Sequence, residues 1–328
     1  MNDGKQVIVS GVKPTGRGQT HIGNYFGMMK QLVDMQNEYF IHAFIPDYHA
    51  LTTLHEADTL KKNILDIAID YIAVGLDTNK VHLFKQSDVP EHTELAWIFN
   101  CITPISHLER AHAYKAAQAD KKEVSVGTFE YPLLMAADIL LYDADIVPVG
   151  SDQKQHVEIT RDVAQRFNNT FGETFKLPAE KIVETVAIVP GTDGRKMSKS
   201  YGNIVPLFAE DIELEKAVMS IVTDSKTPKE PKDPETCNIF ALHKLFSTEE
   251  LPTIEKRYRE GEIGYKESKE ILLENLKSFI QPLRERRKTL AADQDRVLDI
   301  LKRGGEIARE QATEKMREIR EKVGVALY

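Results

Sequence analysis

The chain has very few cysteines and no long apolar run. Of its 328 residues only Cys101 and Cys237 are cysteines, and neither has a CxxC partner. We therefore expect two buried structural thiols, and no disulfide framework, zinc site or iron-sulfur cluster. No apolar run approaches the roughly 18 residues that span a bilayer, and the amino terminus lacks the apolar stretch of a secretion signal. These absences predict a cytoplasmic protein without membrane contact.

The chain also lacks the excess of positive charge that a broad nucleic-acid coat requires. Its formal net charge is -8, from 43 Lys and Arg against 51 Asp and Glu. Residues 281–328 differ, because they hold 12 of those basic residues and 9 of the acidic ones, a net charge of +3. Any contact with RNA is therefore expected to be local, and this C-terminal segment is one candidate for it.

Up to about residue 203, short β-branched runs alternate with amphipathic stretches. This pattern is typical of a parallel sheet with crossover helices. It predicts an α/β fold, a Rossmann-like doubly wound parallel sheet whose ligands lie at the carboxyl ends of the strands. Strands are expected at 7–9, 41–45, 81–84, 146–149 and 183–189, and helices at 56–74, 91–100, 129–142 and 153–167, besides one that starts at Ile22.

Beyond residue 203 the strand signals fade and charged, Leu- and Ile-punctuated segments follow. We expect an appended all-helical domain at 204–328 after a catalytic domain at 1–203, with a Pro-rich loop at 227–234. The last helix is expected at 297–323, interrupted by Gly304 and Gly305, and it is a candidate to pack back on the first domain.

The segment His21-Ile22-Gly23-Asn24 stands where a Gly- and Pro-rich loop enters the first helix. A helix N-terminus offers unpaired N–H groups and partial positive charge, and a glycine lets a phosphate come close. His21 and Asn24 can donate hydrogen bonds to a nucleotide. The alternative is a tight strand-to-helix turn with His21 as a surface cap. For the loop alone both interpretations carry equal weight, and its position after the first strand favours nucleotide binding.

A second segment, 190–200, contains Lys196 and Lys199 three residues apart in a glycine-containing loop. Flexible ammonium groups are suited to the charge that grows on a departing pyrophosphate. A solvated charged loop is the alternative. Together with the first segment, the five residues from Lys196 to Ser200 favour the functional interpretation.

These two segments resemble the two signature sequences of class I aminoacyl-tRNA synthetases. Residues 131–142 (YPLLMAADILLY), followed by 147–156, are similar to the amino-acid pocket of bacterial tryptophanyl-tRNA synthetases, and the similarity extends to 47–52 and 304–309. The resemblance implies that L-tryptophan reacts with ATP, bound with Mg²⁺, to give tryptophanyl-adenylate and pyrophosphate. The tryptophanyl group is then transferred to the 3′ end of tRNA(Trp). It further implies a homodimer whose helical domain binds the tRNA anticodon.

The residues of the helix expected at 129–142 can be interpreted on their own. Tyr131, Met135 and Asp138 lie at i, i+4 and i+7, on one helical face. A carboxylate there can accept an indole N–H while a thioether packs against the ring. A tyrosine pocket commonly has Gln at the position of Met135. In isolation, core packing of Met135 and a buried salt bridge or cap for Asp138 are the more common outcomes.

The resemblance assigns a complete set of site residues. Catalysis is assigned to His21, Lys115, Lys196 and Lys199. ATP binding is assigned to Lys13, Pro14, Thr15, Gly23, Asn24, Gly150, Ser151, Asp152, Ala187, Lys196, Met197, Ser198, Lys199 and Ser200. Tryptophan binding is assigned to Gly11, His49, Tyr131, Met135, Asp138, Val147, Val149 and Gln153.

Several alternatives to these assignments stay open. Lys115 is equally well explained as a solvated helix lysine, and Ser151 or Asp152 as an N-cap. The loop 14–21 is about two residues longer than the usual form in the family, so its phosphate contacts can be displaced. Tyrosyl specificity, nucleotidyl transfer to a small metabolite and a catalytically idle paralogue are the competing functions.

Overall fold

One five-stranded parallel sheet forms the centre of the protein. The computed structural model describes residues 4–11, 20–111, 114–115, 124–149, 154–182 and 189–327. The strands lie in the order β3-β2-β1-β4-β5, which is that of a doubly wound α/β sheet. Their bounds are β1 Val7–Gly11, β2 Phe40–Ile45, β3 Val81–Lys85, β4 Ile146–Val149 and β5 Ala179–Ile182.

Four of the five predicted strands are confirmed. The fifth, expected at 183–189, falls outside the described residues except for Val189, which is not in a strand. Among the described residues, the last strand of the sheet is β5, Ala179–Ile182, which pairs with β4 from Ile146 onward. Its sequence, AEKI, has too little apolar character to predict a strand.

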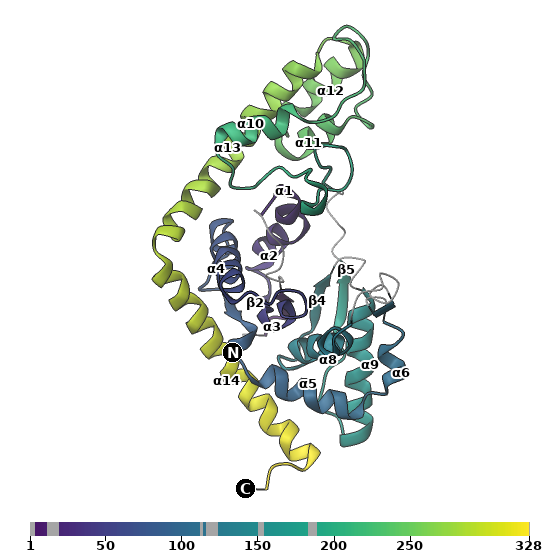
Figure 1. The fold of residues 1–328 in the computed structure, drawn as a ribbon, viewed down its shortest axis with the longest axis vertical. Helices are drawn as coiled ribbons and strands as arrows, with labels where there is room; N and C mark the ends of the chain where they lie inside the picture. The colour runs from purple at the N-terminus through teal and green to yellow at the C-terminus, as the bar shows by residue number, and fades with distance from the viewer. Residues whose placement is uncertain are drawn as a thin grey trace.

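Helices cover both faces of the sheet (Figure 1). Strand side chains alternate between two cores, as the pleat requires. Ile8 and Leu83 belong to one core, together with Leu32, Ile69 and Leu276. Val9 and Phe84 belong to a second core, together with Leu95, Leu133 and Val163. Among the described residues, the helices that precede β5 are α1 Ile22–Asn24, the π-helix η1 Tyr25–Met29, α2 Lys30–Met35, α3 Asp47–Ala50, α4 Ala57–Ala73, η2 Gln86–Asp88, α5 Glu91–Ile102, α6 Ile105–Leu108, α8 Val126–Leu140 and α9 Lys154–Phe171. The predicted helices of this region are confirmed, with ends shifted by a few residues.

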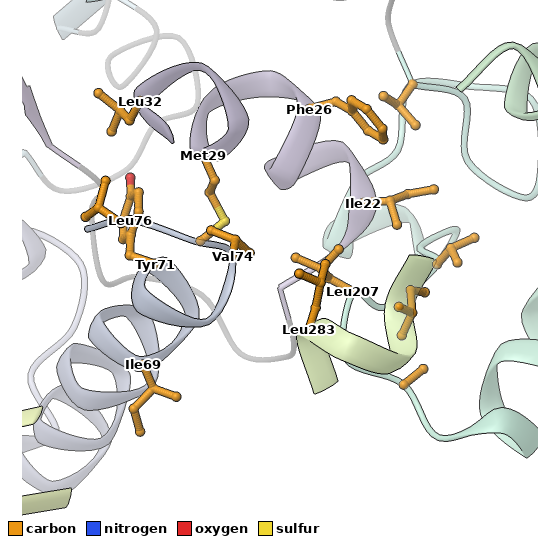
Figure 2. Packing of buried hydrophobic residues seen from close by; sticks show 14 of the residues in the cluster. Ile22, Phe26, Met29, Leu32, Ile69, Tyr71, Val74, Leu76, Leu207 and Leu283 are labelled. Atoms are coloured by element: carbon orange, nitrogen blue, oxygen red, sulfur yellow. The ribbon is translucent and has the colours of Figure 1, made fainter. Parts of the chain in front are cut away.

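The first helical segment, from Ile22 through α1, η1 and α2, is continuous. Its apolar side chains Ile22, Phe26, Met29 and Leu32 recur every three or four residues and form one buried stripe (Figure 2). The stripe contacts the end of α4 and parts of the helical region. The π turn directly after Asn24 is of the kind that is frequent at functional sites.

In the described part of the helical region, residues 204–327, all the secondary-structure elements are helices. They are α10 Asp211–Met219, α11 Asn238–Phe246, α12 Leu251–Glu260, α13 Tyr265–Ala292 and α14 Gln294–Val323. Figure 1 shows α10 to α12 at one end of the molecule, while α13 and α14 run in succession down its side. Among the helices of the described ranges, none is long and apolar enough to cross a membrane.

α14 packs along β3, the edge strand of the sheet (Figure 1). A methyl group added to Gly304 would lie 2.1 Å from the Leu83 carbonyl oxygen, and one added to Gly305 would lie 2.8 Å from Cβ of Asp88. The two glycines therefore permit contact between the helix and the strand backbone. The prediction that they interrupt the last helix is wrong, because α14 is unbroken from Gln294 to Val323.

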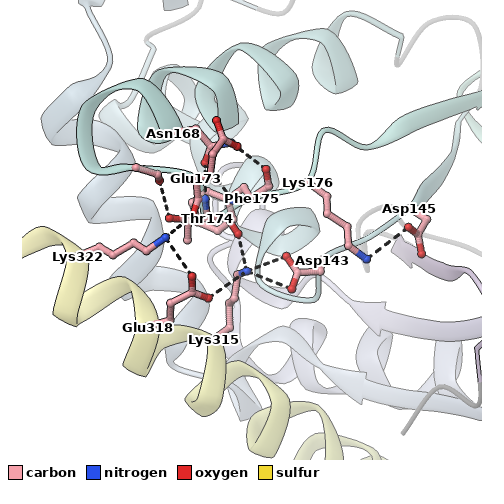
Figure 3. Close-up of polar contacts among 11 residues, drawn as sticks. Asp143, Asp145, Asn168, Glu173, Thr174, Phe175, Lys176, Lys315, Glu318 and Lys322 are labelled. Carbon is pink, nitrogen blue, oxygen red and sulfur yellow. Dashed lines mark hydrogen bonds and ion pairs between the residues drawn. The ribbon is translucent and has the colours of Figure 1, made fainter.

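A polar cluster connects the last turns of α14 with the turn before β4 and with the turn after α9 (Figure 3). Lys315 Nζ lies 2.8 Å from Oδ1 of Asp143 and donates to the Thr174 carbonyl oxygen at 2.7 Å. Lys322 donates to the Glu173 carbonyl oxygen. Asp143 itself has φ 48°, a left-handed conformation that Asp tolerates better than most residues. The turn before β4 and the turn after α9 are thus joined to the C-terminal helix.

The two cysteines differ in exposure. Cys237 is half-buried, and its Sγ lies 3.8 Å from the hydroxyl of Tyr258. Cys101 is exposed, so the prediction that both thiols are buried is wrong for this residue. The buried stripe of α5 includes Leu95 and Phe99, and Cys101 falls on the opposite side of the helix.

Candidate active site

The carboxyl ends of β1 and β4 mark the crevice where ligands bind in this fold. The two strands are neighbours, and the order of strand addition reverses between them. At the end of β1, a Cβ added to Gly11 would lie 2.9 Å from the Phe44 ring, so any larger residue there would have to displace that ring. Several predicted site residues follow these two strands or precede Val189 and lie outside the described residues: Lys13, Pro14, Thr15, Gly150, Ser151, Asp152, Gln153 and Ala187.

His21 lies at the start of α1 and is buried, with 5% of its surface exposed. Its backbone N–H donates to Oδ1 of Asn24 at 3.1 Å, which closes the first turn. Burial, reinforced by the positive charge of Lys199, lowers the pKa of His21 to about 4. The imidazole is therefore neutral at pH 7, and its Nδ1 has no hydrogen-bond partner within the described ranges. A surface cap, the alternative for this residue, is inconsistent with that burial.

The second lysine segment is the end of a tight antiparallel turn, in which Pro190 pairs with Lys196. Lys196 is exposed, Ser198 and Lys199 are partly exposed, and the side chain of Met197 is buried. Burial lowers the pKa of Lys199, and the negative charge of Asp70 partly opposes that shift. Met197 therefore anchors the segment while the two lysines lie at its surface.

Asn203 holds this turn together from inside. Its Oδ1 accepts the backbone N–H of Ser198 at 2.8 Å, and its Nδ2 donates to Oδ1 of Asp193 at 2.7 Å and to the Lys196 carbonyl oxygen at 3.2 Å. A Cβ on Gly191 would lie 2.2 Å from the same Nδ2. The position of both lysines is thus set by one buried amide that the sequence interpretation did not single out.

The two signature segments, more than 170 residues apart in the chain, lie side by side. Ile22 N–H donates to the Val205 carbonyl oxygen at 3.0 Å, and His21 forms a β-bridge with Pro206. A Cβ on Gly23 would lie 3.3 Å from Cβ of Met197. The fold therefore brings the neutral imidazole and the two ammonium groups to one edge of the crevice.

Asp138 is the centre of a buried polar cluster on α8. Its Oδ1 accepts hydrogen bonds from Gln86 Nε2 at 2.7 Å and pairs with His92 Nδ1 at 2.6 Å, and its Oδ2 lies 3.0 Å from His49 Nε2. Burial alone would raise the pKa of Asp138, but the hydrogen bonds and charges of His49 and His92 outweigh it and lower the pKa to about 2. The carboxylate is ionised and acts as an acceptor only.

The cluster continues away from the crevice through His92. Its Nε2 lies 2.8 Å from the hydroxyl of Tyr142, whose ring stacks on His42 at 4.4 Å between centroids. Burial, with the negative charges of Asp138 and Glu91, raises the pKa of Tyr142. The phenol of Tyr142 is therefore protonated at neutral pH, and it holds His92 from the side opposite Asp138.

The other predicted residues lie in different surroundings. Tyr131 is half-buried and its hydroxyl lies 2.8 Å from His156 Nε2, while its ring meets His49 edge-on at 6.0 Å. Met135 packs partly buried against the second core. Val147 and Val149 are buried in that core, and Lys115 is exposed. The structure thus brings His49, Tyr131 and Asp138 together.

Gln86 and His92 are the residues of this cluster that sequence reasoning missed. Gln86 directly follows β3, and a polar residue after an apolar strand is a signal that could have been used. His92 lies in the first turn of α5 and gives no comparable signal. In the described part of the chain, no group of three or more His, Cys, Asp or Glu side chains could hold a metal ion.

Comparison with known proteins gives consistent matches. The family described as tRNA synthetases class I (W and Y) matches residues 1–281. The tryptophan–tRNA ligase of Fusobacterium nucleatum is 48% identical over 319 residues, 97% of this chain and 97% of that protein. The ligase of the same name from Rhodopirellula baltica is 46% identical over 97% of this chain and 99% of its own. A crystal structure of Campylobacter jejuni tryptophanyl-tRNA synthetase complexed with ADP and tryptophan has a TM-score of 0.91 at 45% identity, covering 97% of this chain and 100% of that one.

Proposed function

The chain belongs to the class I tRNA synthetases of the tryptophan and tyrosine type, and from this premise we propose that it is a tryptophan–tRNA ligase. A carboxylate oxygen of L-tryptophan attacks the α-phosphorus of ATP, the bond between the α- and β-phosphates breaks, and pyrophosphate leaves. A ribose hydroxyl at the 3′ end of tRNA(Trp) then attacks the carbonyl carbon of the adenylate, and AMP leaves. Neither step needs a covalent intermediate on the enzyme.

The nucleotide side of the reaction is assigned to the two signature segments. Nδ1 of His21, which has no hydrogen-bond partner among the described residues, is proposed to contact the phosphates of MgATP, together with the ammonium groups of Lys196 and Lys199. The imidazole is neutral, so the positive charge that stabilises the departing pyrophosphate comes from the two lysines. Stabilisation of that charge in the transition state accelerates the reaction. Gly23 and Asn24 complete this assignment, together with Met197, Ser198, Ser200 and the assigned residues outside the described ranges.

The buried ionised carboxylate of Asp138 is the observation that carries the amino-acid side of the proposal. Among the described residues, two hydrogen-bonded partners of Asp138 use Oδ1 and one uses Oδ2, and we assign the remaining acceptor capacity of Oδ2 to the indole N–H. Met135 is proposed to pack against the ring. Since a phenol could also donate to this carboxylate, the distinction from tyrosine depends on the thioether and on the shape of the pocket.

ATP–pyrophosphate exchange with tryptophan, tyrosine and phenylalanine tests this proposal. We expect exchange with tryptophan alone, and Asp138→Asn should raise KM for tryptophan strongly while KM for ATP changes little. Exchange with tyrosine in place of tryptophan would establish the rival specificity. No exchange with any of the three would refute the ligase proposal.

Lys199 offers a second test. Lys199→Ala should slow adenylate formation far more than it weakens tryptophan binding, because the ammonium group acts on charge that develops in the transition state. Lys216→Ala, a change of an exposed lysine on α10, is the matched control. An unchanged rate for Lys199→Ala would remove this residue from the mechanism.

We also propose that domain 1–203 carries out catalysis and that the helical domain, 204–328, contacts the tRNA anticodon.

We further propose that the protein is a homodimer in the cytoplasm. Three apolar side chains support a partner surface: Trp97 on α5, Ile105 on α6 and Val126 on α8 are 68%, 67% and 70% exposed. Sedimentation of the wild type should give a dimer and Trp97→Asp a monomer. A monomeric wild type would contradict this part.

A further inference from the structure

Asp70, on α4, is a buried carboxylate that the proposed chemistry does not use. Only 4% of its surface is exposed, and its neighbours on the helix, Ile69 and Tyr71, belong to the core. Burying a carboxylate is costly unless the charge is paired and its oxygens accept hydrogen bonds. Each oxygen of Asp70 meets a different part of the chain, and neither partner lies on α4.

One oxygen of Asp70 binds the first signature segment. Oδ2 accepts a hydrogen bond from the hydroxyl of Thr20, the residue directly before His21. The backbone of Thr20 is held from the other side, since its carbonyl oxygen accepts the N–H of Leu207 at 2.8 Å. Thr20 is therefore fixed between α4 and the chain that leaves the second signature segment.

The other oxygen binds the helical region. Oδ1 accepts from Nε of Arg287 on α13 at 2.6 Å, and the guanidinium of Arg287 lies 5.3 Å from the centre of the Phe208 ring. The negative charge of Asp70 also acts on Lys199. One carboxylate thus connects the segment before His21, the segment after Lys199 and the long helix of the helical region.

Asp66 provides an internal comparison for this arrangement. It lies one turn earlier on the same face of α4 and accepts from the same guanidinium, Arg287 Nη2, at 2.9 Å. It is more exposed than Asp70, and its side chain pairs with Lys62 and Arg287. Among the described residues, it makes no hydrogen bond to Thr20. Both carboxylates connect α4 with α13 through Arg287, but Asp70 also accepts the hydrogen bond from Thr20. A comparison of the two residues therefore separates the contact with Thr20 from the contact between the helices.

We propose that Asp70 is a positioning residue for the adenylation step, which holds Thr20 and thereby His21 in register with the segment that carries Lys199. The proposal rests on the proposed function, because it concerns the ATP side of that reaction. Its physical basis is that a small displacement of groups that contact the reacting phosphates is costly in rate. The tryptophan side, around Asp138, should be unaffected.

The test compares Thr20→Val, Thr20→Ser, Asp70→Asn and Asp66→Asn in ATP–pyrophosphate exchange, with tryptophan affinity and thermal unfolding measured for each. Thr20→Val removes one hydroxyl and keeps the Asp70–Arg287 pair. It should lower kcat/KM for ATP about tenfold, the size expected for one hydrogen bond to a charged acceptor, with tryptophan affinity unchanged. Thr20→Ser should restore the wild-type value.

Asp70→Asn should reduce kcat/KM for ATP at least as much as Thr20→Val, and Asp66→Asn should leave it within about twofold. Equal kinetic losses in Asp66→Asn and Asp70→Asn, or wild-type kinetics in Thr20→Val, would overturn the proposal and reduce Asp70 to a structural tie. If Asp70→Asn does not fold, the two Thr20 variants still decide the question. Absence of exchange in the wild type would instead refute the proposed function.

Discussion

Gly304 lies where two physical effects predict opposite results. Replacing a glycine by alanine inside a helix stabilises the helix by roughly 0.5–1 kcal/mol, because the unfolded chain loses conformational freedom. In α14, however, the new methyl group would lie 2.1 Å from the Leu83 carbonyl oxygen. A relaxed contact between carbon and oxygen is about 3.3 Å or longer, so helix and strand must separate by on the order of 1 Å.

Overpacking of this kind costs about 1–3 kcal/mol or more, because the obstacle is the backbone of a strand and cannot rotate away. We therefore expect Gly304→Ala to lower the free energy of unfolding by roughly 1–2 kcal/mol net, from the same overpacking and propensity terms. Unfolding in urea, followed by circular dichroism, measures this change. Gly27→Ala is the matched control, since Gly27 is also helical and an added Cβ would meet no atom within 4 Å. A Gly304→Ala protein as stable as Gly27→Ala would refute the account of how α14 meets β3.

Three further predictions concern other parts of the molecule. Lys315→Met should destabilise the fold by about 1–3 kcal/mol, since it leaves Asp143 and a backbone carbonyl without their charged donor, whereas Arg317→Ala should change stability little because that pair is exposed. Burial lowers the pKa of His243 to about 4, so stability should fall as pH drops from about 6.5 towards 4, where the unfolded chain binds a proton that the fold excludes. The unfolding temperature should track that fall, less steeply in His243→Gln, and a constant temperature between pH 7 and 5 would contradict it. Asn203→Ala should slow adenylate formation tenfold to about a hundredfold with tryptophan affinity unchanged, and an unaltered rate in stopped-flow measurements would show that the lysine turn does not depend on this amide.

The sheet could be predicted from the sequence because its strands are short apolar runs bounded by helices of clear period. β1 to β4 are each rich in Val, Ile or Phe, so the hydrophobic pattern alone locates them. β5 could not be found in this way, since AEKI is held at the sheet by its pairing with β4 and not by its own apolar character. Tertiary pairing overrides local preference at such a strand.

The glycines of α14 illustrate a second limit of the sequence. In a helix, two adjacent glycines most simply suggest a weak point, and the interpretation as an interruption followed from propensity alone. Their actual cause, the close approach of Leu83 and Asp88, involves residues more than 200 positions earlier. No local pattern contains that information.

The candidate site shows the same division. His21, Lys196, Lys199 and Asp138 were recognisable because they belong to short motifs. The groups that hold them, Asn203 for the lysines and Gln86 for Asp138, are polar residues without a motif. Their roles depend on which segments meet in space, so a single sequence does not reveal them.

The C-terminal helix also contributes to the surroundings of Asp138. Arg309 and Thr313 both reach Oε1 of Glu91, the first residue of α5 and the neighbour of His92. Gln311 Oε1 lies 2.9 Å from Nε2 of His42, whose ring stacks on Tyr142.

The helix therefore touches both groups that flank the pair of His92 with Asp138. Because His92 fixes one oxygen of that carboxylate, the position of α14 against β3 and α5 bears directly on the geometry of the proposed amino-acid pocket. The approach that Gly304 permits is thus a condition for the site as well as for the fold.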